Sequence, residues 1–68
     1  MYDLVIYFDG DNPDHDFVTE IKSPVVPIVG NDMMIVYDGH LYWGDITNIT
    51  YDFKEEGEFC INVAVKES

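Results

Sequence analysis

The sequence has one cysteine and no long apolar run. The first shortage excludes an internal disulfide, and the second excludes a membrane-spanning helix. Cys60 has no second cysteine to pair with, so the internal disulfide common in small secreted domains is absent. No basic-then-apolar leader follows Met1, because Asp3 interrupts the opening run. The apolar runs are far shorter than the roughly 20 residues that span a bilayer. We therefore expect a cytoplasmic protein that does not bind membranes.

Basic residues are also scarce, since 3 Lys+Arg stand against 14 Asp+Glu and the formal net charge is −11. Such a surface repels nucleic-acid phosphates and anionic lipid headgroups, which excludes direct binding to either. The chain is nevertheless 47% hydrophobic and 15% aromatic, too apolar for a disordered acidic tail. Its 68 residues suffice for one core, so residues 1–68 are predicted to form a single acidic domain.

The short length makes the stability of this domain marginal. Ordering a chain opposes folding by about 1.5 kcal/mol per residue, which apolar burial barely offsets at this size. Repulsion among the acidic side chains adds to that deficit at low salt. A second copy that covered exposed aromatic side chains would supply further burial, so we expect a homodimer rather than a monomer.

Alternating apolar residues predict short strands between turns. The pattern predicts strands over residues 2–9, 16–22, 33–37, 41–53 and 58–66, and the fourth can begin at His40. The first two strands are expected to form a hairpin. Pro24 and Pro27 keep the following segment out of a central strand. Asp38-Gly39 predicts a two-residue hairpin turn with positive φ at both positions.

The fourth predicted strand is irregular. Gly44 indicates a kink, and Ile46 and Ile49 lie three apart, so the alternation slips near Thr47-Asn48. A slip of one residue inside a strand is typical of a β-bulge, which lets a sheet bend around its core. No window has an apolar stripe of helical period. We predict an all-β fold with little or no helix: a five-stranded antiparallel half-open barrel or rolled sheet with a bulged fourth strand.

The sequence offers no catalytic constellation. It contains no glycine-rich phosphate loop, nucleophile elbow or metal-spaced Cys/His pair. His15 and His40 fall in or beside predicted turns, and Cys60 falls in the middle of a predicted strand. A chain this short also has little room for a closed pocket. We therefore predict no enzyme activity, no catalytic residue and no cofactor.

A calcium site is an alternative that the acidic N-terminal half leaves open. Counted from Asp9, acidic residues fall at positions 1, 3 and 12 of a twelve-residue loop, as in an EF-hand. The match fails where position 5 is Pro13 and position 6 is Asp14 instead of glycine. We therefore predict a solvated acidic hairpin tip with at most weak divalent-cation association, and no dedicated metal site.

The acidic residues gather in two dense groups that flank predicted turns. The 9–20 acidic group comprises Asp9, Asp11, Asp14, Asp16 and Glu20, and the 52–58 acidic group comprises Asp52, Glu55, Glu56 and Glu58. Carboxylates at positions i and i+2 of a strand lie about 6.6 Å apart on one face, about two axial phosphate steps of one DNA strand. Rows of this kind would present a phosphate-like ladder to a protein that grips DNA. All nine residues are candidate partner-binding residues.

The stretch from residue 24 to residue 53 resembles small acidic β proteins encoded by bacteriophages. It begins with Pro24-Val25-Val26-Pro27-Ile28-Val29-Gly30-Asn31-Asp32 and, after a short strand, continues through Asp38-Gly39 into an aromatic strand that ends in Tyr51-Asp52-Phe53. The pattern lies in roughly the C-terminal two thirds of the chain and consists of turns and strands. It carries over no individual contact residue.

Several phage proteins of this kind are DNA mimics. They occupy the DNA-binding surface of a host protein, such as an HU-type nucleoid protein, a uracil-DNA glycosylase or a CRISPR effector. The resemblance implies a non-enzymatic inhibitor of a basic DNA-binding protein in the host bacterial cytoplasm. An HU-type target is favoured, because a small dimeric acidic mimic suits a small dimeric basic clamp.

The alternative is a small phage structural or adaptor module that joins a larger complex through a Tyr42/Trp43 surface. Tyrosine and tryptophan are enriched among the residues that dominate protein interfaces. Tyr42 and Trp43 are adjacent on one predicted strand and therefore point to opposite faces, so a single-layer sheet cannot bury both.

Overall fold

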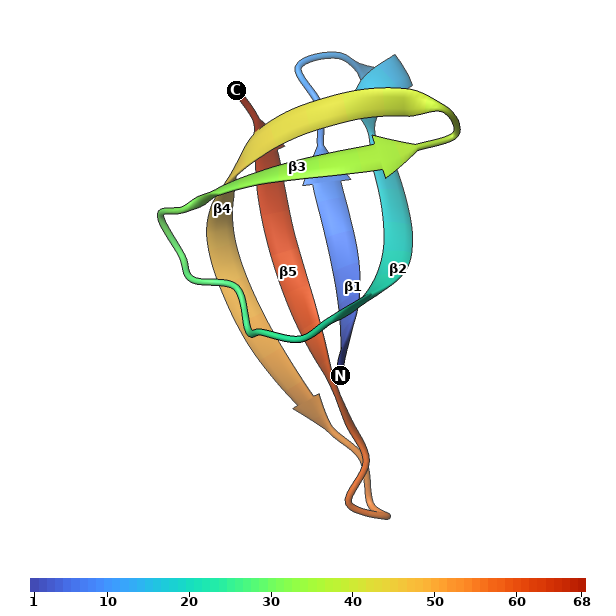
Figure 1. The fold of residues 1–68 in the computed structure, drawn as a ribbon, viewed down its shortest axis with the longest axis vertical. Coiled ribbons are helices and arrows are strands. Elements are labelled where there is room, and N and C mark those ends of the chain that lie inside the picture. The colour runs from blue at the N-terminus through green and yellow to red at the C-terminus, as the bar shows by residue number, and fades with distance from the viewer.

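The five strands form one sheet that curls into a half-barrel, as the computed structural model of all 68 residues shows (Figure 1). The strands are β1 (Tyr2–Asp9), β2 (Phe17–Ser23), β3 (Asp32–Tyr37), β4 (His40–Phe53) and β5 (Phe59–Glu67). The only helical element is the 3-10 turn η1 (Pro13–His15), which is too short to cross a membrane. The predicted all-β half-barrel of five strands is confirmed.

The strand order is β2-β1-β5-β4-β3. β1 pairs antiparallel with β2, as the hairpin prediction required, and the β3–β4 and β4–β5 pairs are also antiparallel. The prediction of a purely antiparallel sheet is wrong at one place, because β1 and β5 run parallel. The connection over residues 24–31 crosses the half-barrel (Figure 1), and β5 therefore returns beside β1 in the same direction. No local signal in either strand specifies that partner.

The core lies on the concave face of the sheet, and the central strand β5 and its neighbour β1 supply most of it. Every second residue of β1 and β5 points inward, because successive side chains of a strand alternate between faces. Full burial of such a side chain contributes about 1.5–3 kcal/mol. The buried apolar residues are Leu4, Ile6, Phe8, Phe17, Ile35, Ile46, Ile61, Val63 and Val65.

β4 bends across the top of the half-barrel at two predicted irregularities. The register with β5 shifts between Ile46 and Asn48, which confirms the predicted bulge. Gly44 is buried, and a Cβ at this position would lie 2.6 Å from the backbone oxygen of Lys66, so glycine permits the close approach of β4 to β5. The two-residue turn that leads into β4 has φ values of 51° at Asp38 and 78° at Gly39, as predicted.

The proline-containing connection stays outside the sheet, as predicted. Ser23 Oγ donates a hydrogen bond of 2.6 Å to the carbonyl of Val25, and Val26 packs against the core. The N–H of Gly30 donates to the carbonyl of Ile46 at 2.9 Å. These contacts fix the chain just before it enters β3.

Candidate functional site

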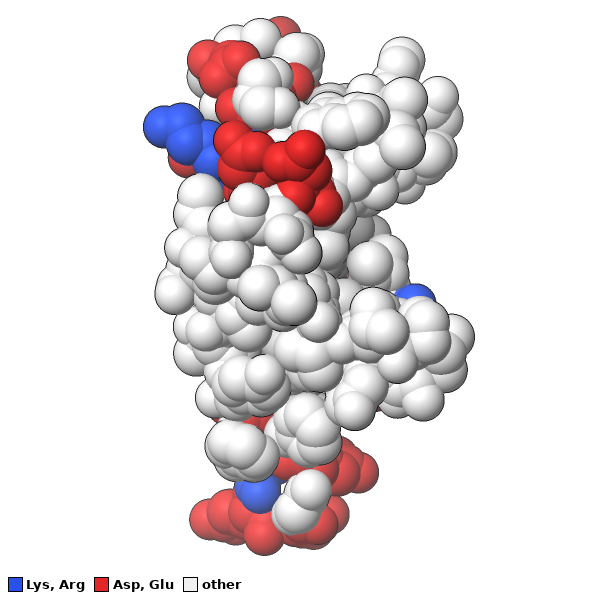
Figure 2. Space-filling model, turned by 60° about the vertical axis from the view of Figure 1, so that its left-hand side comes forward, with Lys and Arg blue, Asp and Glu red and all other residues white.

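The two acidic groups lie at opposite ends of the molecule's long axis. The Cα atoms extend over 37 × 24 × 20 Å. The 9–20 acidic group surrounds the β1–β2 connection, and the 52–58 acidic group surrounds the β4–β5 turn. Figure 2 shows acidic surface toward both ends and a largely uncharged surface between them. Glu20 stands apart from its group, because it lies within β2 opposite Val5.

No strand carries the predicted row of carboxylates. On the outer face of β2, the neighbours of Glu20 two residues away are Val18 and Lys22. On β1, the outer positions between Asp3 and Asp9 are apolar or aromatic. The acidic residues concentrate at turns and strand ends, so the expectation of an i, i+2 ladder is wrong. The charge forms two end patches instead.

The lysines neutralise few of the candidate residues. Lys22 Nζ lies 2.7 Å from Asp3 Oδ1, and Lys54 Nζ lies 3.0 Å from Asp52 Oδ2. The hydrogen bond to Asp3 raises the pKa of Lys22 and lowers that of the Asp3 carboxyl. Asp52 is therefore the one candidate residue that forms an ion pair with a lysine, and it is half-buried. The other eight candidates are exposed.

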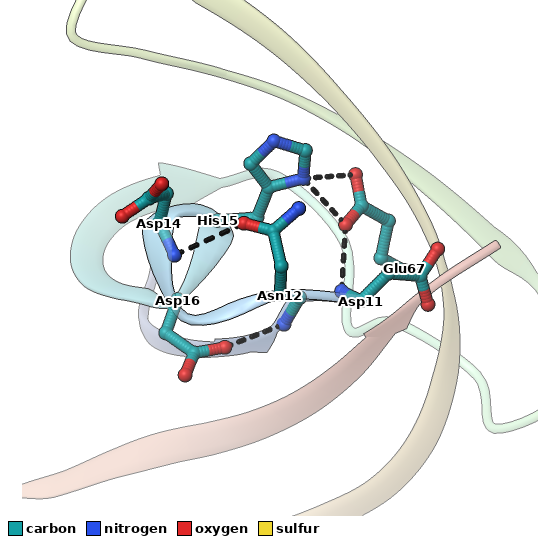
Figure 3. A network of polar contacts seen from close by, with 7 residues as sticks. Asp11, Asn12, Asp14, His15, Asp16 and Glu67 are labelled. Atoms are coloured by element: carbon teal, nitrogen blue, oxygen red, sulfur yellow. Dashed lines mark hydrogen bonds and ion pairs between the residues drawn. The ribbon is translucent and has the colours of Figure 1, made fainter.

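The tip of the 9–20 acidic group is held by its own hydrogen bonds (Figure 3). The N–H of Gly10 donates to Asp16 Oδ1 at 2.7 Å. The N–H of Asp14 donates to Asn12 Oδ1 at 3.1 Å, which caps the 3-10 turn. Asp16 therefore serves the fold of the tip, whereas the carboxylates of Asp9 and Asp14 project into solvent.

Glu67 ties this tip to the end of β5, and sequence reasoning missed it. Its Oε1 accepts from the N–H of Asp11 at 2.8 Å and from His15 Nδ1 at 2.8 Å (Figure 3). The bond from the Asp11 N–H and then that from His15 lower the pKa of Glu67, and the bond to Glu67 raises the pKa of His15. The His15 ring also packs edge-on against Tyr42, with centroids 5.7 Å apart. More than fifty residues separate Glu67 from the tip, so no local pattern predicts the contact.

Asp45, on the β3–β4 hairpin, is another carboxylate whose pKa is shifted by a neighbouring side chain. Asp32 and Asp45 are directly opposite in the strand register. A hydrogen bond from Asp45 to Asp32 raises the pKa of Asp45, which means that the pair favours holding a proton. Neither residue forms an ion pair with a lysine.

The outer face of the same hairpin is apolar and exposed. Four side chains form what we call the hairpin patch, and their exposed fractions are 56% for Met34, 71% for Val36, 62% for Leu41 and 49% for Trp43. Register places Met34 opposite Trp43 and Val36 opposite Leu41, so the four side chains are cross-strand neighbours. The sequence signal for this patch was the run Met33 to Tyr37, which is apolar on both faces.

Only Trp43 of the predicted Tyr42/Trp43 surface belongs to this patch. The Tyr42 ring points to the concave face, with its centroid 5.4 Å from that of Phe8 and 4.9 Å from that of Phe17. The prediction that the two rings point to opposite faces is confirmed. Tyr42 is half-buried and helps to close the core beneath the hairpin.

Three aromatic rings accompany the 52–58 acidic group. Tyr51 and Phe53 stack at 6.4 Å, and Phe53 lies 5.6 Å from Phe59. All three are exposed, although they occupy inward positions of their strands. The β4–β5 hairpin extends beyond the rest of the half-barrel (Figure 1), so nothing covers its inner face. Phe59 is therefore exposed, although the alternation along β5 places it on the same face as the buried Ile61.

The structure does not bring Cys60 and a histidine together. No three His, Cys, Asp or Glu side chains are arranged to hold a metal ion. Asp16 accepts the N–H of Gly10, and Glu20 lies within β2. The acidic residues at the calcium-loop spacing are therefore not arranged around one cation site. The Sγ of Cys60 is 3.9 Å from Asp52 Oδ2, at the opposite end from the pair that His15 forms with Glu67.

Comparison with known proteins found no match: no protein-family model, no curated protein and no solved structure proved similar to this chain.

Proposed function

We propose that the protein is a non-enzymatic DNA mimic whose acidic ends occupy the DNA-binding surface of a basic protein, with an HU-type nucleoid protein as the favoured target. One observation carries this proposal: exposed carboxylates gather at both ends of a chain whose net charge is −11, and only Asp52 among them is paired with a lysine. Carboxylates replace phosphates as acceptors for lysine and arginine.

The spacing of the two ends favours a mimic of separated phosphates. The long axis measures 37 Å, and one turn of B-DNA spans about 34–36 Å. Phosphates that face one side of a duplex recur once per turn. The 9–20 and 52–58 acidic groups would therefore stand for phosphates about one turn apart, with the more sparsely charged sheet as a spacer (Figure 2).

The mechanism is electrostatic. Opposite charge fields steer the two proteins together and raise the association rate. Salt screens exposed charges over about 10 Å at 0.1 M ionic strength, so the complex should weaken steeply as salt rises. The acidic ends would compete with DNA for the same lysine and arginine side chains of the target.

The test measures binding to a purified HU-type dimer by calorimetry at about 50 and 300 mM NaCl, together with competition against a DNA duplex. Two triple variants neutralise one end each: Asp9→Asn/Asp11→Asn/Asp14→Asn and Glu55→Gln/Glu56→Gln/Glu58→Gln. The control Asp32→Asn/Asp38→Asn/Asp45→Asn removes the same charge from the β3–β4 hairpin, outside both acidic groups. We expect each end variant to bind at least about tenfold more weakly and the control to change binding less than about threefold.

The proposal fails if the protein shows no DNA-competitive binding at low salt to an HU-type protein, a uracil-DNA glycosylase or a CRISPR effector. It also fails if the control variant weakens binding as much as the end variants do, because the effect would then reflect net charge and not the position of the carboxylates.

A second candidate function is a structural or adaptor module that binds through the hairpin patch. Exposed apolar patches bordered by polar residues mark protein-interaction surfaces. Trp43→Ala distinguishes the candidates, because it removes the largest side chain of the patch and no charge. Loss of partner binding with Trp43→Ala alone supports the adaptor, whereas loss with the end variants alone supports the DNA mimic.

A further inference from the structure

β3 has an unpaired edge. It lies at one end of the sheet order and pairs only with β4. Near its C-terminal end, Tyr37 stacks on Phe17 of β2 with centroids 4.3 Å apart, but no backbone pairing joins β3 to β2. Residues 32–36 therefore present a free strand edge, which is a template for another strand.

The hydrogen bonds around β4 show which backbone groups of β3 are free. The N–H of Ile46 donates to the carbonyl of Asn31 at 2.9 Å, and the N–H of Ser68 donates to the carbonyl of Trp43 at 3.2 Å, away from β3. Backbone groups alternate in direction along an antiparallel pair. The odd-numbered residues of β3 therefore bond to β4, and Met34 and Val36 direct their N–H and C=O groups to the free edge.

The free backbone groups and the hairpin patch belong to the same residues. Met34 and Val36 project their side chains onto the outer face, where they meet Trp43 and Leu41 across the hairpin. A strand added to β3 would place every second side chain beside this patch.

Carboxylates lie at both ends of the free edge. Asp32 begins β3 opposite Asp45, and Asp38 follows β3 in the turn. Like charges directly opposite in a sheet are destabilising, and no lysine forms an ion pair with Asp32 or Asp45. A guanidinium or ammonium group at this position would relieve the repulsion.

We propose that β3 binds an extended segment of a partner protein by strand addition. The segment has apolar residues at the alternate positions that face Met34 and Val36, and arginine or lysine at the positions that face Asp32 and Asp38. This inference deepens the second candidate function and does not depend on the acidic-end proposal. Main-chain bonds would supply affinity, and the patch with its carboxylates would supply specificity.

Charge decides between a partner segment and a second copy of this chain. Pairing two β3 edges would bring together the Asp32, Asp38 and Asp45 carboxylates of two chains whose net charge is −11 each. A basic segment removes the same repulsion that self-pairing would increase. We therefore assign the edge to a basic and apolar partner segment.

The test uses a capped heptapeptide, Arg-Thr-Val-Thr-Val-Thr-Arg, which presents the same pattern in either chain direction. The protein contains one tryptophan, Trp43, so its fluorescence reports on the patch. We expect a saturable blue shift with this peptide and at least about tenfold weaker binding when glutamate replaces both arginines. Equal binding of the two peptides would overturn the charge assignment.

Val36→Pro tests strand addition itself. Proline removes an N–H that faces the free edge and is tolerated on edge strands, so circular dichroism should show a folded protein. We expect it to abolish peptide binding. Leu41→Thr is the matched control, because it trims the patch on β4 and leaves the β3 edge intact; it should weaken binding by less than about tenfold. If Trp43→Ala abolishes binding and Val36→Pro does not, the patch stands as a surface and strand addition is wrong.

Amide hydrogen exchange of the unaltered protein provides a test that requires no variant. We expect the amides of Met34 and Val36 to exchange quickly in the free protein and slowly with the peptide, while those of Met33 and Ile35 remain protected in both states. Protection of Met34 and Val36 without peptide, lost on dilution together with a dimer in sedimentation, would assign the edge to a second copy and overturn the proposal.

Discussion

Glu67 and Asp16 accept backbone N–H bonds within the β1–β2 connection, whereas Asp9 and Asp14 project freely from it. Some carboxylates of the tip thus stabilise its backbone, whereas others remain free to bind a partner. Charge removal at Asp16 or Glu67 would alter the fold of the tip together with its surface. Tests of partner binding therefore need the projecting residues, and tests of stability need the bonded ones.

The His15–Glu67 pair should stabilise the fold within a defined pH range. The contribution of Glu67, whose folded-state pKa is lowered, is present above its ordinary pKa and is lost as the pH falls through the lowered value. The contribution of His15, whose folded-state pKa is raised, is present below its ordinary pKa and is lost as the pH rises through the raised value. Urea unfolding should show the largest loss for Glu67→Gln between about pH 4.5 and 6.5.

His15→Phe is the matching variant, because it keeps a ring beside Tyr42 but cannot be protonated. Its unfolding free energy should lack the decline that the unaltered protein shows as the pH rises through the His15 pKa. A difference between Glu67→Gln and the unaltered protein that stays constant from acid to alkaline pH would contradict the ionic contact.

Asp45 should destabilise the fold at neutral pH. Its folded-state pKa is raised by the hydrogen bond to Asp32, so the folded protein binds a proton more tightly than the unfolded chain and stability falls as the pH rises through this titration. Asp45→Asn should therefore raise the melting temperature at pH 7 and change it less at pH 3. Glu56→Gln removes one charge from an exposed turn and serves as the control; equal shifts for both variants would indicate a general charge effect.

At the scale of elements, β4 determines the shape of the half-barrel. Its fourteen residues pair with both β3 and β5. The bulge between Ile46 and Asn48 bends the strand, so that its two halves run in different directions. The hairpin patch faces outward because β4 turns the β3–β4 hairpin over the core. The position of the proposed binding edge therefore depends on where β4 bends.

Gly44→Ala should destabilise the protein, because the new Cβ would lie 2.6 Å from both the Lys66 backbone oxygen and Val65 Cγ1. Overpacking of this kind reduces stability by about 1–3 kcal/mol, which a thermal melt can measure. Gly39→Asn is the control, since a Cβ at Gly39 would have nothing within 4 Å and asparagine tolerates positive φ. Similar effects of both changes would show that backbone freedom, and not crowding, matters at Gly44.

The sequence predicted the strands, the hairpin turn and the bulge because each depends on local chemistry. Alternation located β1 within Tyr2–Asp9, and Asp38-Gly39 located the tightest turn. The parallel β1–β5 pair and the contact of Glu67 with the tip were not predictable in this way, because both join the two ends of the chain. The same holds for Phe59, whose exposure depends on how far a hairpin extends beyond the core.

At the scale of the whole molecule, charge and shape act together. The sequence indicated a strongly acidic surface but not its arrangement, since turns that are distant in the chain can lie at the same end or at opposite ends. The fold places the 9–20 and 52–58 acidic groups far apart (Figure 2). This arrangement limits repulsion between the groups and leaves repulsion within each one.

Added salt should therefore stabilise the protein. Screening of its negative charges favours the compact state, so the melting temperature should rise between about 10 and 200 mM NaCl. NaCl and MgCl2 should have the same effect at equal ionic strength. A larger rise with MgCl2 or CaCl2 would instead reveal specific cation binding, and no change with salt would mean that self-repulsion does not limit stability.

The parallel partnership of β1 and β5 has a consequence for how the chain acquires its structure. β5, the fifth strand in chain order, fills the middle of the sheet between β1 and β4, so all five strands must have left the ribosome before the hydrophobic interior can close. Non-local strand pairing of this kind is slow, on the order of milliseconds to seconds in small β proteins. Until then the nascent chain has strand edges with unpaired N–H and C=O groups. Its dense negative charge would keep neighbouring copies apart during that time and so oppose aggregation.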